Sequence, residues 1–201
     1  MSVIRISLNH QKHLEIAADL AVSYLRRGEI IIYPTETCYG IGADATNPDA
    51  VKKVIKIKKM PEDKPISIIC SDISMIKKYA VLDNKTKNLI KQFMPGPLTL
   101  ILKKKNIPDI VSKSTIGLRI SSHPLARLIT KKLGRPITAT SANIHKEPPL
   151  YSVEHLGKTL AVDFVIDVGR LPRRKPSTIF DTRTKKIIRR GPITLKNLTG
   201  A

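Results

Sequence analysis

Residues 29–45 read EIIIYPTETCYGIGADA, and this stretch decides the fold. Its first five residues, 29–33, form an apolar and β-branched run that ends at Pro34, which is typical of a buried strand. The loop expected after it, residues 34–46, begins with a segment, 34–42, that carries hydroxyls, a carboxylate and two glycines. Glycines let a backbone approach a ligand closely, and open α/β sheets bind ligands where strands end. The stretch therefore predicts a central strand followed by either a binding loop or a structural turn.

Helical and extended patterns alternate on both sides of this strand. Residues 11–27 place apolar side chains on one helical stripe, and Gly28 follows at the position of a left-handed cap. After the loop, Asn47 and Pro48 form a typical helix start. We expect further helices at about 72–80, 84–94, 124–133 and 153–160, and strands at 66–70, 98–102, 117–121, 137–140, 163–168, 177–181 and 186–189.

This order of elements predicts an α/β protein. The last three strands follow one another without helices between them, so we expect a twisted, mixed sheet with flanking helices. No internal repeat or low-complexity linker divides the chain. The prediction is a single domain over residues 1–201, with its core at about 14–193.

The composition is globular, with a large excess of positive charge. The 201 residues include 36 Lys and Arg against 16 Asp and Glu, a net charge of +20 that favours polyanionic neighbours. Cys38 and Cys70 form no C-x-x-C pair, so both are expected to be small core residues. The five histidines lack metal-ligand spacing, so no protein metal site is expected. No apolar run is long enough for a membrane span or signal peptide, which predicts a cytoplasmic protein without membrane partners.

Two further polar groups accompany the 34–46 loop. The segment 138–143 runs from an expected strand into small hydroxyl and amide residues, which suit either a phosphate site or a turn. Lys58 and Arg189 are cations at expected element ends, whereas Arg119 lies inside an apolar strand. A cation in that position needs an anionic partner, either a structural carboxylate or a bound ligand. The basic segment 171–177 is expected to be a solvated turn.

Six separated motifs together resemble one known family, the YrdC-type threonylcarbamoyl-adenylate synthases of the YrdC/YciO superfamily. The resemblance implies a YrdC-like α/β domain with a large, positively lined cavity. It also implies a nucleotidyltransferase that forms threonylcarbamoyl-AMP and pyrophosphate from L-threonine, bicarbonate and ATP, for tRNA threonylcarbamoyladenosine modification. The motifs are YPTETCYGIGADA (33–45), PGPLTLIL (95–102), TIGLRISSHP (115–124), TATSAN (138–143), PSTIFD (176–181) and IIRRGPI (187–193).

The same resemblance implies a role for each matching residue. Threonine would be bound by Thr35, Arg119 and Ser177, with Arg119 forking onto its carboxylate. Mg²⁺ would arrive with ATP, and the product would pass to a downstream tRNA threonylcarbamoyl-transferase. ATP would be bound by Lys58, Thr115, Ser141, Asn143 and Arg189, of which Lys58, Ser141 and Asn143 would also be catalytic.

One residue departs from the family pattern. The family has Lys-x-Arg-Pro at the end of the second helix, whereas this chain has Lys58-Lys59-Met60-Pro61. Methionine cannot neutralise phosphate, and Lys59 or Lys64 would substitute only as a point charge. Two alternatives therefore stay open: a non-catalytic or divergent YrdC/YciO-type paralogue that binds RNA or nucleotides, and a carbamoyl-adenylate former that uses carbamoyl phosphate.

Overall fold

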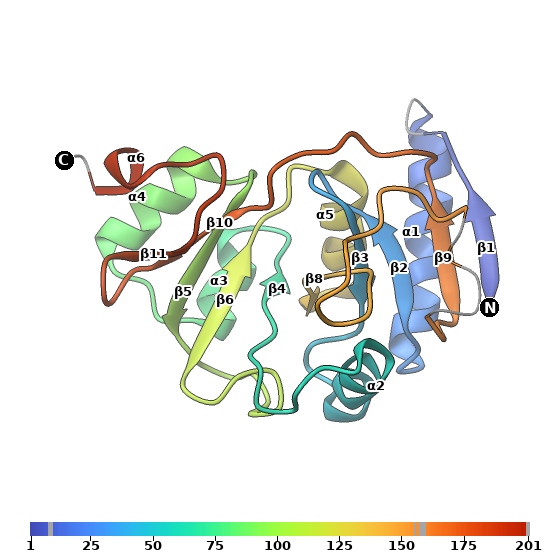
Figure 1. Ribbon diagram of the computed structural model, residues 1–201, viewed down its shortest axis with the longest axis horizontal. Helices are drawn as coiled ribbons and strands as arrows, with labels where there is room; N and C mark the ends of the chain where they lie inside the picture. Colours follow the sequence, from blue (N-terminus) through green and yellow to red (C-terminus); the bar gives the residue numbers. More distant parts are fainter. Residues whose placement is uncertain (8–9, 155, 157–159, 200–201) are drawn as a thin grey trace.

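The strands form two mixed sheets that lie side by side (Figure 1). The computed structural model describes residues 1–7, 10–154, 156 and 160–199. The strand order is β1-β9-β2-β3-β8 in the first sheet and β11-β10-β5-β6-β4-β7 in the second. The predicted α/β class, with mixed sheet and flanking helices, is confirmed. The sequence predicted one sheet because its strand pattern carries no information on where the hydrogen-bonded ladder breaks.

The first sheet is built around the predicted central strand β2. All four of its residues are buried, and it runs parallel to β9 and antiparallel to β3. β3 lies inside the stretch predicted to be a loop, because glycines at alternate positions hide its strand pattern. Its strands are β1 (Ser2–Arg5), β9 (Phe164–Asp167), β2 (Ile31–Pro34), β3 (Tyr39–Gly42) and β8 (Thr140–Ser141).

The glycines of β3 make room for a tyrosine. A Cβ on Gly42 would come within 2.9 Å of the Tyr33 ring, and one on Gly40 within 3.1 Å. Tyr33 is fully buried and donates a hydrogen bond to the Thr138 carbonyl at 2.9 Å. Close packing on this ring therefore explains Gly42, rather than the approach of a ligand.

The second sheet contains the longest strands of the described chain. β5 and β6 pair antiparallel at its centre, and β5 runs parallel to β10. β4 forms only two residues of the predicted 66–70 strand, and β6 begins two residues earlier than predicted. Its strands are β11 (Lys186–Arg189), β10 (Thr178–Asp181), β5 (Leu98–Lys103), β6 (Thr115–Arg119), β4 (Ile68–Ile69) and β7 (Ile137–Thr138).

Helices pack against both sheets (Figure 1). Apolar residues of α1 and α5 pack against β2 and β9 in one core cluster, and α3 and α4 lie against the second sheet. Asn47 caps α2 as predicted, since its side chain accepts the N–H groups of residues 49 and 50. The helix predicted for 153–160 lies partly outside the described residues. The helices are α1 (Gln11–Arg26), α2 (Pro48–Lys58), α3 (Ile73–Tyr79), α4 (Asn84–Phe93), α5 (Pro124–Leu133) and α6 (Leu195–Thr199).

Two segments pass from one sheet to the other. The predicted strand 137–140 divides at Ala139: Thr138 pairs with Ile68 in the second sheet, whereas Thr140 pairs with Ile41 in the first. Residues 168–177 connect β9 to β10 and also cross between the sheets (Figure 1). These crossings bring the ends of strands from both sheets to a common space.

Candidate functional site

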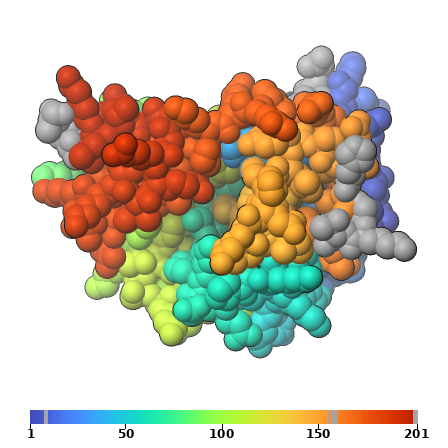
Figure 2. Space-filling model, viewed as in Figure 1, coloured from blue at the N-terminus to red at the C-terminus, as the bar shows by residue number. Residues whose placement is uncertain are grey.

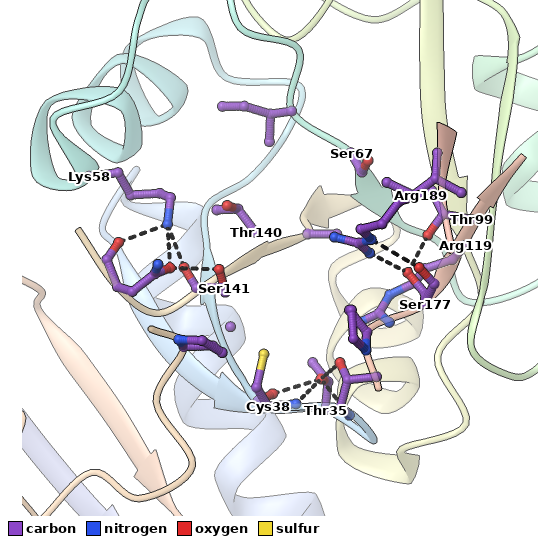
Figure 3. A pocket seen from close by; sticks show the side chains of 18 of the residues that line it. Thr35, Cys38, Lys58, Ser67, Thr99, Arg119, Thr140, Ser141, Ser177 and Arg189 are labelled. Atoms are coloured by element: carbon purple, nitrogen blue, oxygen red, sulfur yellow. Dashed lines mark hydrogen bonds between the residues drawn. The ribbon is translucent and has the colours of Figure 1, made fainter. Parts of the chain in front are cut away.

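A cavity of about 620 Å³ lies between the two sheets. Figure 2 shows the surface hollowed between the red C-terminal part of the chain and the orange segment that follows β8. Side chains point into this space from both sides (Figure 3). Seven of the eight predicted site residues line the cavity: Thr35, Lys58, Arg119, Ser141, Asn143, Ser177 and Arg189.

Thr115 is the predicted site residue that does not line the cavity. It begins β6, whereas Arg119 ends the same strand. Both side chains share a face because strand side chains alternate, but four residues separate them by roughly 13 Å. Thr115 pairs with Lys103 at the far end of β6, away from the crossing segments.

The β2–β3 hairpin forms the floor of the cavity, and Thr35 holds its turn. The Thr35 hydroxyl donates to the Cys38 carbonyl at 2.7 Å and accepts the N–H groups of Thr37 and Cys38 at 3.2 and 3.3 Å. These bonds confirm the structural turn, and its residues Thr35 and Cys38 line the cavity. Cys38 lines the cavity and is half-buried, so its assignment to the core was wrong, while Cys70 is fully buried as predicted. Burial raises the pKa of the Cys38 thiol.

Lys58 holds the segment that follows β8. Its ammonium donates to the carbonyls of Ser141 and Asn143 at 2.6 and 2.8 Å and to Asn143 Oδ1 at 3.0 Å. Asn143 Oδ1 also accepts the Ser141 hydroxyl at 2.6 Å. An ammonium has three N–H groups, so these three acceptors use its whole donor capacity. Burial lowers the pKa of Lys58 to about 8.

Arg119 has the structural carboxylate that its position in an apolar strand required. Its Nη1 donates to Glu36 Oε1 at 3.0 Å, and both side chains are more than nine-tenths buried. Within the described chain, no protein acceptor meets its Nε and Nη2. This edge presents two parallel N–H groups, the arrangement that fits a carboxylate. The guanidinium is thus shared between a protein carboxylate and the cavity.

Arg189 and Ser177 form the opposite wall. The Arg189 guanidinium donates to the Ser177 carbonyl at 3.0 Å and to its hydroxyl at 2.9 Å, and that hydroxyl lies 2.9 Å from Thr99 Oγ1. Burial, together with the neighbouring Arg119, lowers the pKa of Arg189. Two like charges turned toward one cavity favour an anionic ligand between them.

Met60 and Lys64 occupy the wall near Lys58. Met60 is 8% exposed and lines the cavity, so the thioether stands where the family pattern has a guanidinium. Lys64 also lines the cavity, whereas Lys59 does not. Of the two substitutes considered from the sequence, only Lys64 therefore faces this space.

Several lining residues were not predicted as site residues. Arg174 and Pro176 line the cavity, although residues 172–176 are exposed, as the solvated-turn interpretation of 171–177 predicted. Their segment has no apolar periodicity, and only the crossing between sheets brings it to the cavity. The cavity is also lined by Ser67, Thr99 and Thr140. These residues lie in predicted strands, but the direction of their side chains depends on the sheet register.

The donor set of the cavity is cationic and hydroxylic rather than metal-binding. Across the described ranges, no group of three or more His, Cys, Asp or Glu side chains is placed to hold a metal ion. Guanidinium, ammonium and hydroxyl groups suit carboxylate and phosphate instead. Within the same residues, no helix has the length and apolar content needed to cross a bilayer.

Comparisons with known proteins identify the family. The family model Sua5_yciO_yrdC, described as "Telomere recombination", matches residues 23–191. A Methanocaldococcus jannaschii relative is 42% identical over 202 residues, covering 98% of this chain and 96% of its own. A relative from Aliivibrio fischeri, named threonylcarbamoyl-AMP synthase, is 34% identical over 85% of this chain and 96% of its own.

Two solved structures have the same fold. The P. abyssi Sua5 structure complexed with L-threonine has a TM-score of 0.86 at 28% identity, and covers 99% of this chain. This chain spans 60% of that longer one. The E. coli YciO structure has a TM-score of 0.81 at 29% identity, covering 98% of this chain and 100% of its own. The chain therefore belongs to the Sua5/YciO/YrdC family.

Proposed function

We propose that this protein is a threonylcarbamoyl-AMP synthase, a nucleotidyltransferase that uses L-threonine, bicarbonate and ATP. The observation that carries the proposal is the convergence of seven predicted site residues, from both sheets, on one cavity of about 620 Å³. The threonylcarbamoyl-AMP synthase name of the A. fischeri relative and the threonine bound to P. abyssi Sua5 support it.

Threonine would bind at the end of the cavity that Arg119 faces. The free Nε–Nη2 edge of Arg119 would take the amino-acid carboxylate in a bidentate pair. Ser177, which holds Arg189 beside Arg119, would close this subsite from the second sheet. The Thr35 hydroxyl already donates to Cys38 and accepts the N–H groups of Thr37 and Cys38, so it would shape the floor of this subsite by holding the turn.

ATP would bind between the wall formed by Lys58 and the 141–143 segment and Arg189 on the opposite wall. Since the three donors of Lys58 are held by protein oxygens, its main contribution is to fix Ser141 and Asn143 and to add positive charge. Arg189 and Lys64 have capacity left for phosphate. Thr115 would contact the nucleotide where ATP extends along β6.

The reaction balances in two steps. The threonine amine attacks the carbon of bicarbonate, and loss of water gives a carbamate. A carbamate oxygen then attacks the α-phosphorus of ATP, and the bond to the leaving pyrophosphate breaks. The cavity contributes orientation and charge neutralisation to this phosphoryl transfer, and it limits the access of water to the labile mixed anhydride.

Mg²⁺ is proposed as the companion of ATP. Within the described residues, Glu147 is the one carboxylate that lines the cavity, so the chain offers too few ligands for a cage of its own. The triphosphate oxygens would supply most of the coordination. When bound, the ion neutralises charge on the leaving pyrophosphate.

The test measures pyrophosphate release with each substrate omitted in turn. The proposal predicts release only when ATP, L-threonine and bicarbonate are all present, with one threonylcarbamoyl-AMP formed per pyrophosphate. Release that persists without threonine would reject it. Replacing threonine by alanine at equal concentration controls for a general effect of amino acids.

The later steps are proposed from the chemistry of the product. A labile acyl-adenylate needs an acceptor, and a cytoplasmic tRNA threonylcarbamoyl-transferase would consume it. The net charge of +20 is compatible with contact to tRNA. Steep loss of tRNA binding between low and physiological salt supports that contact, and salt-independent binding argues against it.

One observation favours a second candidate, a divergent paralogue that binds nucleotide or RNA without catalysis. Met60 lines the cavity where the family pattern has an arginine, so the wall proposed for the nucleotide has one cation fewer. This candidate predicts ATP or RNA binding without threonine-dependent pyrophosphate release, so the same assay separates the two functions.

A further inference from the structure

Glu36 lies behind the cavity wall and does not itself line the cavity. It is part of the turn between β2 and β3, and its side chain is 7% exposed. Burying a carboxylate costs free energy unless its oxygens are fully paired. The contacts of Glu36 therefore show which groups stabilise this buried charge.

Both oxygens of the Glu36 carboxylate are engaged by the second sheet and the residues that follow it. Oε1 accepts Arg119 Nη1 at 3.0 Å, and Oε2 accepts the Ser121 hydroxyl. Ser121 Oγ in turn accepts the backbone N–H of His123 at 3.2 Å, directly before α5 begins. Glu36 thus ties the hairpin of the first sheet to the end of β6 and the start of α5.

These contacts fix the orientation of Arg119. A guanidinium is planar, so a partner on Nη1 determines where the Nε–Nη2 edge points. With Nη1 held by Glu36, the opposite edge is left for the cavity. A buried ion pair is weak evidence for stability, because well-packed apolar residues of similar volume often do as well. The orientation of Arg119 is a reason for the Glu36–Arg119 ion pair to be present.

Glu36 also sets the charge of this end of the cavity. Arg119 and Arg189 are close enough for each charge to act on the other. One buried carboxylate therefore offsets one of these two charges.

We propose that Glu36, anchored by Ser121, is a positioning residue that presents the Nε–Nη2 edge of Arg119 to the amino-acid carboxylate. This inference rests on the proposed function and deepens it. Glu36 acts through Arg119 and touches no substrate. Its removal should therefore weaken threonine binding and leave the nucleotide half of the cavity unchanged.

The experiment measures the binding of L-threonine and of a non-hydrolysable ATP analogue separately, by calorimetry on the full chain. Glu36→Gln keeps the shape and removes the charge, and Glu36→Asp keeps the charge but shortens the reach. The matched control is Glu29→Gln, which removes a carboxylate from an exposed pair with Arg27. Thermal melting verifies that each variant is folded.

We expect Glu36→Gln to weaken threonine binding about tenfold or more, because small misplacements of an orienting group have large effects. Glu36→Asp should be intermediate, Glu29→Gln unchanged, and affinity for the ATP analogue within about twofold of wild type throughout. A variant that loses threonine and nucleotide binding equally would indicate a structural role and overturn the inference. If Glu36→Gln does not fold, Ser121→Ala carries the same expectation.

The inference and the proposed function fail in different ways. If the wild-type protein binds no threonine, the proposed function falls and the inference falls with it. If the wild type binds threonine and a folded Glu36→Gln variant binds it equally well, only the inference is overturned.

Discussion

Replacing Met60 by arginine should increase the catalytic efficiency of this protein with ATP. Met60 is 8% exposed and lines the cavity next to Lys58, whose three donors are held by protein oxygens. A triphosphate on this wall therefore meets the Met60 thioether and no spare donor on Lys58, which leaves Lys64 as the ammonium donor there. Met60→Arg would add a fork of N–H groups at this point.

The size of the effect follows from the bonds gained. A hydrogen bond between charged groups contributes about 1.5–3 kcal/mol net. If it forms in the transition state, kcat/KM for ATP rises about 10- to 150-fold. Lys58 and Lys64 repel the new charge in the free protein, so the variant should melt at a lower temperature and regain stability when ATP is added.

The assay is initial pyrophosphate release against ATP concentration, at saturating threonine and bicarbonate. Leu20→Arg is the control, because it adds the same charge on the exposed face of α1 outside the cavity lining. An unchanged kcat/KM in a folded Met60→Arg variant would refute the reasoning. The Lys64→Met variant would then reveal whether Lys64 already neutralises the triphosphate. If it does, Lys64→Met should lower kcat/KM for ATP more in the protein with Met60 than in the Met60→Arg variant.

Three further predictions concern the walls of the cavity. Arg119→Ala should weaken threonine binding by about 2–5 kcal/mol and lower the free energy of unfolding by about 3–5 kcal/mol, because Glu36 is left buried and unpaired. The double variant Arg119→Met with Glu36→Gln should recover stability but not threonine affinity in denaturant melts and calorimetry, and full recovery of affinity would contradict the assignment. As pH rises through about 8, Lys58 loses its proton and one hydrogen bond, so KM for ATP should increase. The stability of the protein should change in the opposite sense, because between pH 8 and about 10.5 the unfolded lysine binds more protons than the folded one. The free energy of unfolding should therefore rise with pH in this range. A KM profile that is flat from pH 7 to 9 would count against the role of Lys58. Gly191→Ala should destabilise the protein by about 1–3 kcal/mol, since its Cβ would clash with the Pro176 carbonyl oxygen and the Thr178 nitrogen, and unchanged thermal melting would show that this contact can relax.

Local signals in the sequence were sufficient for most elements. The central strand, the helix cap at Asn47 and the turn at Gly28 depend on neighbouring residues alone, and the structure has all three. β3 and the change of sheet at Ala139 depend on which strands pair at long range, and periodicity does not report that. The division into two sheets therefore had to come from the structure.

The candidate site, like the fold, could be predicted only in part from the sequence. The motifs correctly predicted seven residues that line one cavity. They also predicted that Lys58 binds the phosphates, whereas the three N–H donors of Lys58 are occupied by the 141–143 segment. The sequence also left the partner of Arg119 open between a protein carboxylate and a ligand. Glu36 could be identified only once the β2–β3 turn was seen beside the end of β6.

The central claim is that one cavity holds a nucleotide beside an amino acid. A crystal structure with L-threonine and a non-hydrolysable ATP analogue tests it most directly. The account predicts both ligands between the sheets, with the threonine carboxylate on the Nε–Nη2 edge of Arg119 and the phosphates between the 141–143 segment and Arg189. Ligands bound in separate places, or a carboxylate that does not meet Arg119, would contradict it.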